Sequence, residues 1–177
     1  AVIERLNAYQ AGGRSDLLDV EMQITWNNGS AEEKICIGEW YARNANLQQS
    51  VRWGSAALKS LPAKRAYLLA FPKPFEEEVM QAAAEFSLEP ELIWAVMREE
   101  SRFLPSAESW VGARGLMQIM PATGEEIACS LDADFAADDL FDPLTNIRFG
   151  AYYLSTLLRL FDKSSDKALA AYNGGMG

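Results

Sequence analysis

Residues 89–120 constrain the fold and the chemistry of this chain more than any other segment. Their sequence is EPELIWAVMREESRFLPSAESWVGARGLMQIM. Pro90 suits the first turn of a helix, where the N–H group that proline lacks would have no intrahelical partner. At about 100° per residue, the apolar positions of this helix share one face, formed by Leu92, Val96 and Phe103 and flanked by Ile93 and Met97. The segment therefore predicts an amphipathic helix packed on a core, followed by a loop that contains Gly112 and Gly115.

Glu100 is the residue of this segment on which a catalytic interpretation depends. It falls within the apolar arc, whereas Arg98 and Ser101 point the other way. Glu99 lies on the arc's other flank, so periodicity favours Glu100 only slightly. Loss of hydration raises the pKa of a carboxyl group toward the range that a general acid needs. The alternative is a solvated glutamate in a frayed last turn, because charged side chains are rarely fully buried.

Composition places the chain among globular proteins of one or two domains. It has 177 residues, of which 49% are hydrophobic and 23% charged. No apolar run approaches the roughly 18 residues of a spanning helix, so we expect no transmembrane segment. No secretion signal opens the sequence either. The net charge of −9 argues against a nucleic-acid partner, which would call for a basic surface.

The charge is divided unevenly along the chain. Residues 1–74 carry 9 Lys and Arg against 7 Asp and Glu, a net charge of +2, whereas residues 75–177 carry 7 against 18, a net charge of −11. The change coincides with Pro72 and Pro74, and prolines in a polar break are typical of a linker. We therefore predict two domains, residues 1–72 and residues 73–177.

The first domain is expected to consist of helices separated by short polar breaks. Ser15 or Asp16 is a suitable cap for the second helix, and Ser30 with Glu33 has the spacing of a capping box. Helices of this length favour a solenoid-like arrangement of hairpins, with an ordinary helical bundle as the alternative. Four aromatic residues are expected in its core rather than on a sugar-binding surface: Trp26, Trp40, Tyr41 and Trp53.

The residue types limit the chemistry that is available. Histidine is absent, which removes His-dependent triads and His-containing zinc sites. Cys36 and Cys129 lie 93 positions apart, and we expect two free thiols rather than a disulfide bond. Catalysis must therefore depend on carboxylates, hydroxyls, amides or lysine.

The second domain is predicted to be helical throughout, which makes the chain all-α. Amphipathic segments are expected at residues 74–87, 121–129, 143–161 and from about 164 onward. The aspartate-rich residues 131–142 lack the glycine and the last glutamate of an EF-hand, so a solvated loop is preferred to a calcium site. Asp142 is expected to cap the helix that begins at Pro143.

Three motifs resemble the signature of the lysozyme-like lytic transglycosylases. The first begins at Glu100 with ESRFLP, followed by AES and GARGLMQIMPAT; the second, at 142–158, is DPLTNIRFGAYYLSTLL; the third, at 168–177, is ALAAYNGGMG. The resemblance implies a lysozyme-like α-helical catalytic domain, and residues 1–72 are similar to the helical linker region of the soluble family members. It also implies cleavage of the β-1,4 bond between N-acetylmuramic acid and N-acetylglucosamine in periplasmic peptidoglycan, without metal or cofactor.

The resemblance assigns roles to individual residues. Glu100 matches the catalytic glutamate, and Tyr172, with Asn173 beside it, matches the tyrosine that faces it. Ser109 matches the serine near the scissile sugars, and Gln118 and Met120 match glycan-contacting positions; the alternative for Gln118 is a hydrogen-bonded buried amide. Ser101 is expected to hold the turn after the glutamate.

The chain also departs from the family pattern. Where Y-N-A-G-P-G-R is usual, this chain has YNGGMG and ends at Gly177. The predicted catalytic domain is therefore expected to lack the family's C-terminal helices. Two alternatives stay open: a goose-type lysozyme-like hydrolase, which brings an aspartate near the glutamate, and a non-catalytic peptidoglycan-binding protein.

Overall fold

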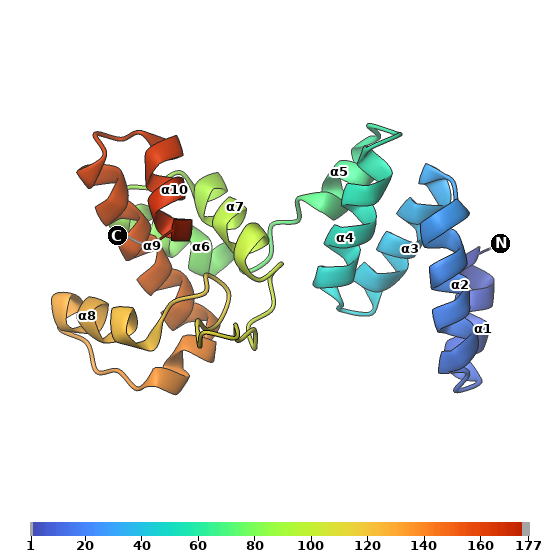
Figure 1. Cartoon of the computed structure of the whole chain (residues 1–177), viewed down its shortest axis with the longest axis horizontal. Coiled ribbons are helices and arrows are strands. Elements are labelled where there is room, and N and C mark those ends of the chain that lie inside the picture. Colours follow the sequence, from blue (N-terminus) through green and yellow to red (C-terminus); the bar gives the residue numbers. More distant parts are fainter. Residues whose placement is uncertain (1, 175–177) are drawn as a thin grey trace. The chain divides into compact units, whose positions relative to one another are not determined.

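The computed structural model describes residues 2–174 and is all-α, as predicted. The last three residues of the YNGGMG segment lie outside the described part of the chain. Within residues 2–174, extended pairing is limited to isolated bridges that join Arg114 to Glu108 and to Ile119. The chain divides into two compact units, Ala1–Pro72 and Lys73–Gly177 (Figure 1).

The described residues of the first unit, 2–72, form five helices that pack mainly on their neighbours in the chain. They are α1 (Val2–Ala11), α2 (Ser15–Asn28), α3 (Ala31–Arg43), α4 (Leu47–Leu58) and α5 (Lys64–Ala70). Helix α3 packs against α4, and α4 packs against α5. Contacts of this local kind are typical of solenoid-like helical hairpins.

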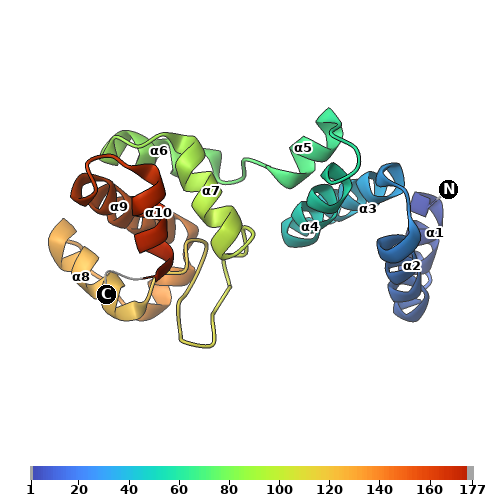
Figure 2. The same cartoon turned by 45° about the horizontal axis from the view of Figure 1, so that its top comes forward.

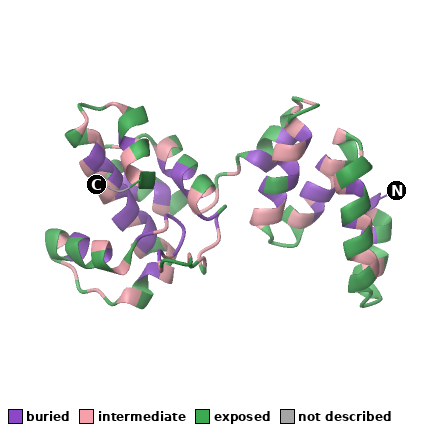
Figure 3. Ribbon diagram, in the orientation of Figure 1, coloured by how far each residue is buried: buried purple, intermediate pink, exposed green. Residues whose placement is uncertain are grey.

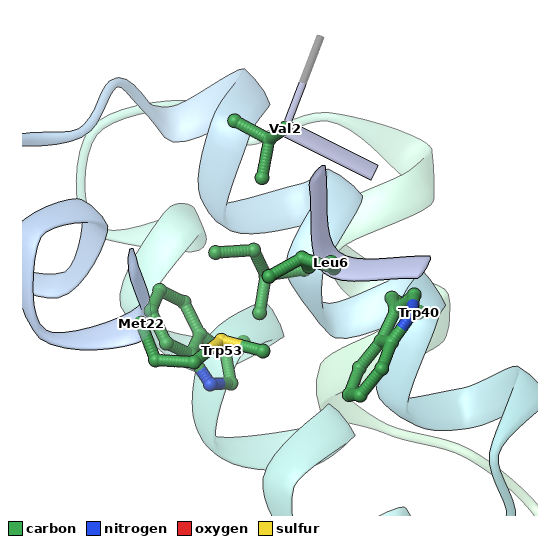
Figure 4. Close-up of a cluster of buried hydrophobic side chains, with 6 residues drawn as sticks. Val2, Leu6, Met22, Trp40 and Trp53 are labelled. Atoms are coloured by element: carbon green, nitrogen blue, oxygen red, sulfur yellow. The ribbon is translucent and has the colours of Figure 1, made fainter. Parts of the chain in front are cut away.

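Aromatic side chains form much of the core of the first unit, as the sequence predicted. Trp40 and Trp53 are buried together with Val2, Leu6 and Met22 (Figure 4). Partly buried aromatic residues pack against this cluster, namely Trp26 and Tyr41. These four aromatic residues therefore stabilise the fold of the unit.

The helix caps of the first unit were predicted correctly in one case and wrongly in another. Ser30 and Glu33 form the expected capping box at the start of α3. At the start of α2, however, the residue in the cap position is Arg14, and it makes no side-chain cap. Asp16 lies inside the first turn, where its carboxylate accepts hydrogen bonds from the Arg14 guanidinium at 2.8 and 2.6 Å. Ser15 is the first helical residue, so neither predicted residue serves as the cap.

The second unit is arranged around α9 (Pro143–Leu160). The other elements are α6 (Glu76–Phe86), α7 (Pro90–Glu100), α8 (Pro121–Leu131), the 3-10 helix η1 (Ala137–Phe141) and α10 (Ser165–Gly174). All five of these elements pack against α9 (Figure 2). Much of α9 is accordingly buried (Figure 3).

The sequence predicted both the start of α9 and most of its buried stripe. The Asp142 carboxylate accepts a hydrogen bond from the Thr145 N–H at 2.9 Å, which makes it the cap. The predicted stripe residues Ile147, Ala151, Leu154 and Leu157 are buried. Leu158 lies at the edge of the stripe and is only partly buried.

Residues 2–174 also show the state of the cysteines, the placement of possible metal ligands, the nature of the helices and the form of the aspartate-rich segment. Cys36 and Cys129 are free thiols, as expected. In this part of the chain no group of three or more His, Cys, Asp or Glu side chains is placed to hold a metal ion. No helix among the described residues is both long enough and apolar enough to cross a membrane. The aspartate-rich segment contains η1, which was predicted as a loop.

Candidate active site

A pocket of about 410 Å³ lies in the second unit. All six site residues proposed from the sequence line it: Glu100, Ser109, Gln118, Met120, Tyr172 and Asn173. They come from the end of α7, from the long loop between α7 and α8, and from α10 (Figure 2). The structure therefore brings together residues that are up to 73 positions apart in the chain. Their catalytic roles remain predictions.

Glu100 is the last residue of α7 and is half-buried. Burial raises the pKa of its carboxyl group by removing water from the charged form, and the negative charge of Glu99 adds to the rise. Glu99 itself is exposed and pairs with Arg98. Among the described residues that line the pocket, Glu100 carries the only carboxylate. A protonated carboxyl group in this position can act as a general acid.

The turn after Glu100 is fixed by Ser101, in agreement with its expected structural role. Ser101 is buried, and its hydroxyl donates a hydrogen bond to the Leu116 carbonyl at 2.8 Å. The same oxygen accepts a hydrogen bond from the Leu104 N–H at 3.2 Å. Arg102 and Phe103 adopt left-handed backbone conformations, which reverses the chain. Ser101 thus ties the end of α7 to the loop that carries Gln118.

Asn146 holds the same loop from the opposite side, and sequence reasoning did not identify it. It is completely buried in α9, and its Oδ1 atom accepts a hydrogen bond from the Met117 N–H at 2.7 Å. Its Nδ2 atom donates to the carbonyls of Arg114 at 2.9 Å and Leu140 at 2.7 Å. The peptide group between Leu116 and Met117 is therefore held at its oxygen by Ser101 and at its N–H by Asn146. The sequence did offer one indication of this role: the amide side chain of Asn146 directly precedes Ile147, the first residue of the predicted buried stripe.

Close packing of this loop on α9 requires glycine at two positions. Gly115 has φ = +76°, and a Cβ atom there would lie 2.1 Å from the Leu140 carbonyl oxygen. A Cβ atom on Gly150 would lie 2.8 Å from the Met117 Cβ atom, which cannot move without the loop backbone. Both distances are far below a van der Waals contact, so side chains are excluded here.

Gln118 is hydrogen-bonded to the backbone of its loop, which is one of the two alternatives that the sequence left open. Its Nε2 atom donates to the Gly115 carbonyl at 2.9 Å and to the Ala107 carbonyl at 3.3 Å. Its Oε1 atom accepts no hydrogen bond from the residues that the structure describes, and the side chain lines the pocket. The amide is thus oriented by the loop, with its oxygen remaining for a ligand. Gln118 also has φ = +51°, a costly conformation for a residue other than glycine.

Tyr172 lies close enough to Glu100 to respond to its charge. The Tyr172 hydroxyl donates a hydrogen bond to the Met117 carbonyl at 2.9 Å. Burial raises the pKa of this hydroxyl strongly, and the charges of Glu100 and Tyr153 raise it further. Tyr172 therefore stays protonated near neutral pH. Tyr153, whose ring centroid is 5.3 Å from that of Tyr172, also lines the pocket and was not singled out from the sequence.

Ser109 closes a tight turn at the edge of the pocket. Its hydroxyl accepts a hydrogen bond from the Ala113 N–H at 2.9 Å, and its own N–H donates to the Ala113 carbonyl at 2.8 Å. Arg114 anchors this turn through ion pairs with Glu108 at 3.2 Å and Asp138 at 3.0 Å. The turn is thereby fixed to the 3-10 helix η1, which contains Asp138.

Comparison with known proteins finds similar chains among the lytic transglycosylases. The chain is 40% identical to a soluble lytic murein transglycosylase of Escherichia coli over 85 residues, which are 47% of this chain and 13% of that protein. A Haemophilus influenzae protein, also placed by name among the soluble lytic murein transglycosylases, is 29% identical over 167 residues, or 92% of this chain.

A solved structure extends the similarity to the whole chain. It is that of the lytic transglycosylase Slt from Pseudomonas aeruginosa, in an inactive mutant with one glutamate replaced by glutamine. The TM-score is 0.76 at 27% identity, and the match covers 98% of this chain. This chain spans 28% of the Pseudomonas chain and 27% of the Haemophilus protein, about a quarter of each.

The family comparison covers the part of the chain that contains the pocket. Residues 77–177 match the family described as the Transglycosylase SLT domain. This match includes all six lining residues proposed from the sequence. The chain belongs to the Transglycosylase SLT domain family.

Proposed function

We propose that this chain carries a lytic transglycosylase site that cleaves the β-1,4 bond between N-acetylmuramic acid and N-acetylglucosamine in peptidoglycan. The observation that carries the proposal is the single half-buried carboxylate of Glu100, which lines a pocket together with the protonated hydroxyl of Tyr172. The comparisons support it, because relatives of this chain are named lytic murein transglycosylases.

The proposed reaction needs only one carboxyl group on the enzyme. Glu100 donates its proton to the glycosidic oxygen as the bond to the muramyl anomeric carbon breaks. The muramyl 6-hydroxyl then attacks this carbon, and Glu100 accepts the proton that the hydroxyl loses. The products are a free N-acetylglucosamine hydroxyl and a 1,6-anhydro ring, with the glutamate returned to its acid form.

The number of carboxylates in the pocket favours this route over ordinary glycoside hydrolysis. Most glycosidases use two carboxyl groups, the second acting as a nucleophile or as a base for water. Glu100 is the one carboxylate among the described lining residues, and no aspartate is among them. A nucleophile supplied by the substrate removes the need for the second group. The inactive Pseudomonas mutant, in which one glutamate is changed, is what such a mechanism predicts.

The other lining residues are proposed to bind the glycan strand. Tyr172 would stabilise the positive charge that develops on the sugar ring, with Asn173 beside it. The oriented Gln118 oxygen would accept a hydrogen bond from a sugar amide or hydroxyl group, and Ser109 and Met120 would contact neighbouring sugars. Each of these residues lines the same pocket.

We further propose that residues 73–177 form the catalytic domain and that residues 1–72 correspond to the helical linker region of the longer relatives. Lytic murein transglycosylases act on the cell wall. The proposed location of this chain is therefore the periplasm of a bacterial cell envelope, with peptidoglycan glycan strands as the substrate.

The identity of the reaction products tests the proposal. Purified peptidoglycan is digested by the chain in water enriched in oxygen-18, and the released muropeptides are identified by mass spectrometry. The proposal predicts 1,6-anhydromuropeptides that contain no oxygen-18. Reducing-end products labelled with oxygen-18 would instead show hydrolysis of the goose-lysozyme type, and binding without any release of products would show a non-catalytic peptidoglycan-binding protein.

A further inference from the structure

Trp110 is almost completely exposed, which sets it apart from the other tryptophans of the chain. Its exposed fraction is 96%, whereas Trp40, Trp53 and Trp94 are buried and Trp26 is partly buried. An indole ring buries a large apolar area when a ligand covers it, so its neighbours decide whether this exposure has a function.

The backbone that carries Trp110 is firmly held. The turn is closed by hydrogen bonds from Ser109 N–H to the Ala113 carbonyl at 2.8 Å and from Gly112 N–H to the Ser109 carbonyl at 2.9 Å. Arg114, directly after the turn, is fixed by its two ion pairs and by the ring of Phe141, whose centroid is 5.2 Å from the guanidinium carbon. Trp110 is therefore carried by a braced turn, so contact with a ligand would need to order the side chain but not the backbone.

The exposed indole stands next to the Glu100 pocket. Its two chain neighbours, Ser109 and Val111, both line that pocket. Val111 and Met120 line it as well, and they are 51% and 40% exposed. The pocket edge beside Trp110 in the chain therefore contains exposed apolar side chains.

We propose that Trp110 is a stacking platform for a sugar ring of the glycan strand, in a subsite just outside the Glu100 pocket. This inference rests on the proposed function, because a glycan strand is the ligand that such a function requires. The C–H face of a pyranose ring is apolar and uncharged, and it can lie flat against an indole ring.

The charge of the surrounding unit favours this occupant over a lipid surface. Residues 75–177 carry a net charge of −11. The cation next to the turn, Arg114, is already paired with Glu108 and Asp138. A site for anionic membranes would instead place unpaired Lys and Arg residues around the exposed aromatic ring.

Binding of glycans of two lengths tests the proposal. Affinities of the full chain for the trimer and the hexamer of N-acetylglucosamine are measured by titration calorimetry, for the parent, Trp110→Ala and Trp110→Phe. Leu160→Ala is the matched control, because Leu160 is also an exposed apolar residue, at 60%, and lies outside the pocket lining. Since Trp110 is at an exposed turn, its replacement is expected to leave the melting temperature unchanged.

The expected result depends on glycan length. Trp110→Ala should weaken hexamer binding about tenfold, the size of one aromatic stacking contact, and should leave trimer binding within about twofold. Trp110→Phe should recover part of the loss, and Leu160→Ala should change neither affinity. Equal effects of Trp110→Ala on trimer and hexamer, or no effect on either, would overturn the proposal. The proposal would also be overturned if the parent bound phosphatidylglycerol vesicles and Trp110→Ala lost this vesicle binding while its hexamer binding stayed unchanged.

The two proposals fail separately in these experiments. A length-dependent loss in Trp110→Ala, without any cleavage of peptidoglycan by the parent, would support the stacking platform and contradict the catalytic proposal. Release of anhydromuropeptides, with hexamer binding unchanged in Trp110→Ala, would support the catalytic proposal and contradict the platform.

Discussion

At the scale of single residues, the distinction between Glu99 and Glu100 decides the chemistry of the site. Helical periodicity favoured Glu100 only slightly, because Glu100 falls within the apolar arc and Glu99 lies on its other flank. The structure separates them: Glu99 is exposed and pairs with Arg98, whereas Glu100 is half-buried and lines the pocket. The side chain with the raised pKa is thus the one that faces the space where a ligand would lie.

The raised pKa of Glu100 predicts a pH-dependent gain in stability for Glu100→Gln. Because the folded state holds this proton more tightly than the unfolded state, the contribution of Glu100 to stability is largest below its ordinary pKa of 4.5 and is lost as pH rises through the higher folded pKa. Glu100→Gln should therefore melt higher than the parent near pH 7, by on the order of a degree or two, and the difference should vanish near about pH 4.

Thermal melts of both proteins across this pH range measure the effect. Glu99→Gln is the matched control, since it removes the same charge from an exposed neighbouring position. A gain for Glu100→Gln that is larger at low pH than at neutral pH would contradict the assignment.

At the scale of secondary-structure elements, the site depends on how α7, α9 and α10 meet the loop at Leu116 and Met117. Ser101 after α7 binds the Leu116 carbonyl, and Asn146 of α9 binds the Met117 N–H. Tyr172 of α10 binds the Met117 carbonyl. The backbone of two consecutive loop residues is therefore hydrogen-bonded to side chains from, or directly after, three helices, which fixes the loop that lines the pocket.

This arrangement predicts a large loss of stability for Asn146→Ala. The substitution leaves one N–H group and two carbonyl groups without their buried partner, which should cost about 2–4 kcal/mol of unfolding free energy. Urea denaturation measures the loss. Asn27→Ala, at an exposed position of α2, is the control and should change the free energy of unfolding by less than about 0.5 kcal/mol. A loss of that small size for Asn146→Ala would show that the contacts do not hold the loop.

Local signals explain which elements could be predicted from the sequence. Pro90, Pro121 and Pro143 each begin a helix, and Asp142 caps the last of these, because such preferences act within one turn of the chain. The features that were missed depend on distant partners. Asn146 binds a residue 29 positions away, and Arg114 fixes η1 through Asp138, 24 positions away. Helical periodicity carries no information about such pairs.

Periodicity indicated Glu100, whereas the roles of the other five site residues could be proposed only through motif resemblance. Ser109, Gln118 and Met120 lie in a loop without helical periodicity, and Tyr172 is 72 positions after Glu100. Their assembly depends on how the loop packs on α9. Ser109 and Gln118 were predicted as ligand contacts. Both also have a structural role, because their side chains hydrogen-bond to the backbone of the loop itself.

At the scale of the whole molecule, each of the two units has a core of its own. Leu6 is completely buried in the aromatic cluster of the first unit, and Leu154 is completely buried in α9 of the second. The catalytic proposal places every functional residue in the second unit. Loss of packing in the first unit is therefore expected to act on stability rather than on chemistry.

The prediction for Leu6→Ala follows from these separate cores. Removing this buried side chain should destabilise the first unit by about 2–5 kcal/mol. Hydrogen exchange measured by mass spectrometry should show lost protection in peptides from residues 2–72 and retained protection in peptides from residues 73–174. Leu154→Ala is the matched variant and should show the reverse pattern. Equal loss of protection across both units in Leu6→Ala would contradict the account.

If Glu100 alone serves as acid and base, peptidoglycan cleavage should depend on Glu100 and not on its neighbour. The cleavage rates of Glu100→Gln and Glu99→Gln test this. Release of muropeptides over time, at equal concentrations of folded protein, gives both rates. We expect Glu100→Gln to lower the rate by about 10²–10⁴-fold and Glu99→Gln to stay within about twofold of the parent. A Glu100→Gln variant that cleaves at the parental rate, or a Glu99→Gln variant that is equally impaired, would contradict it.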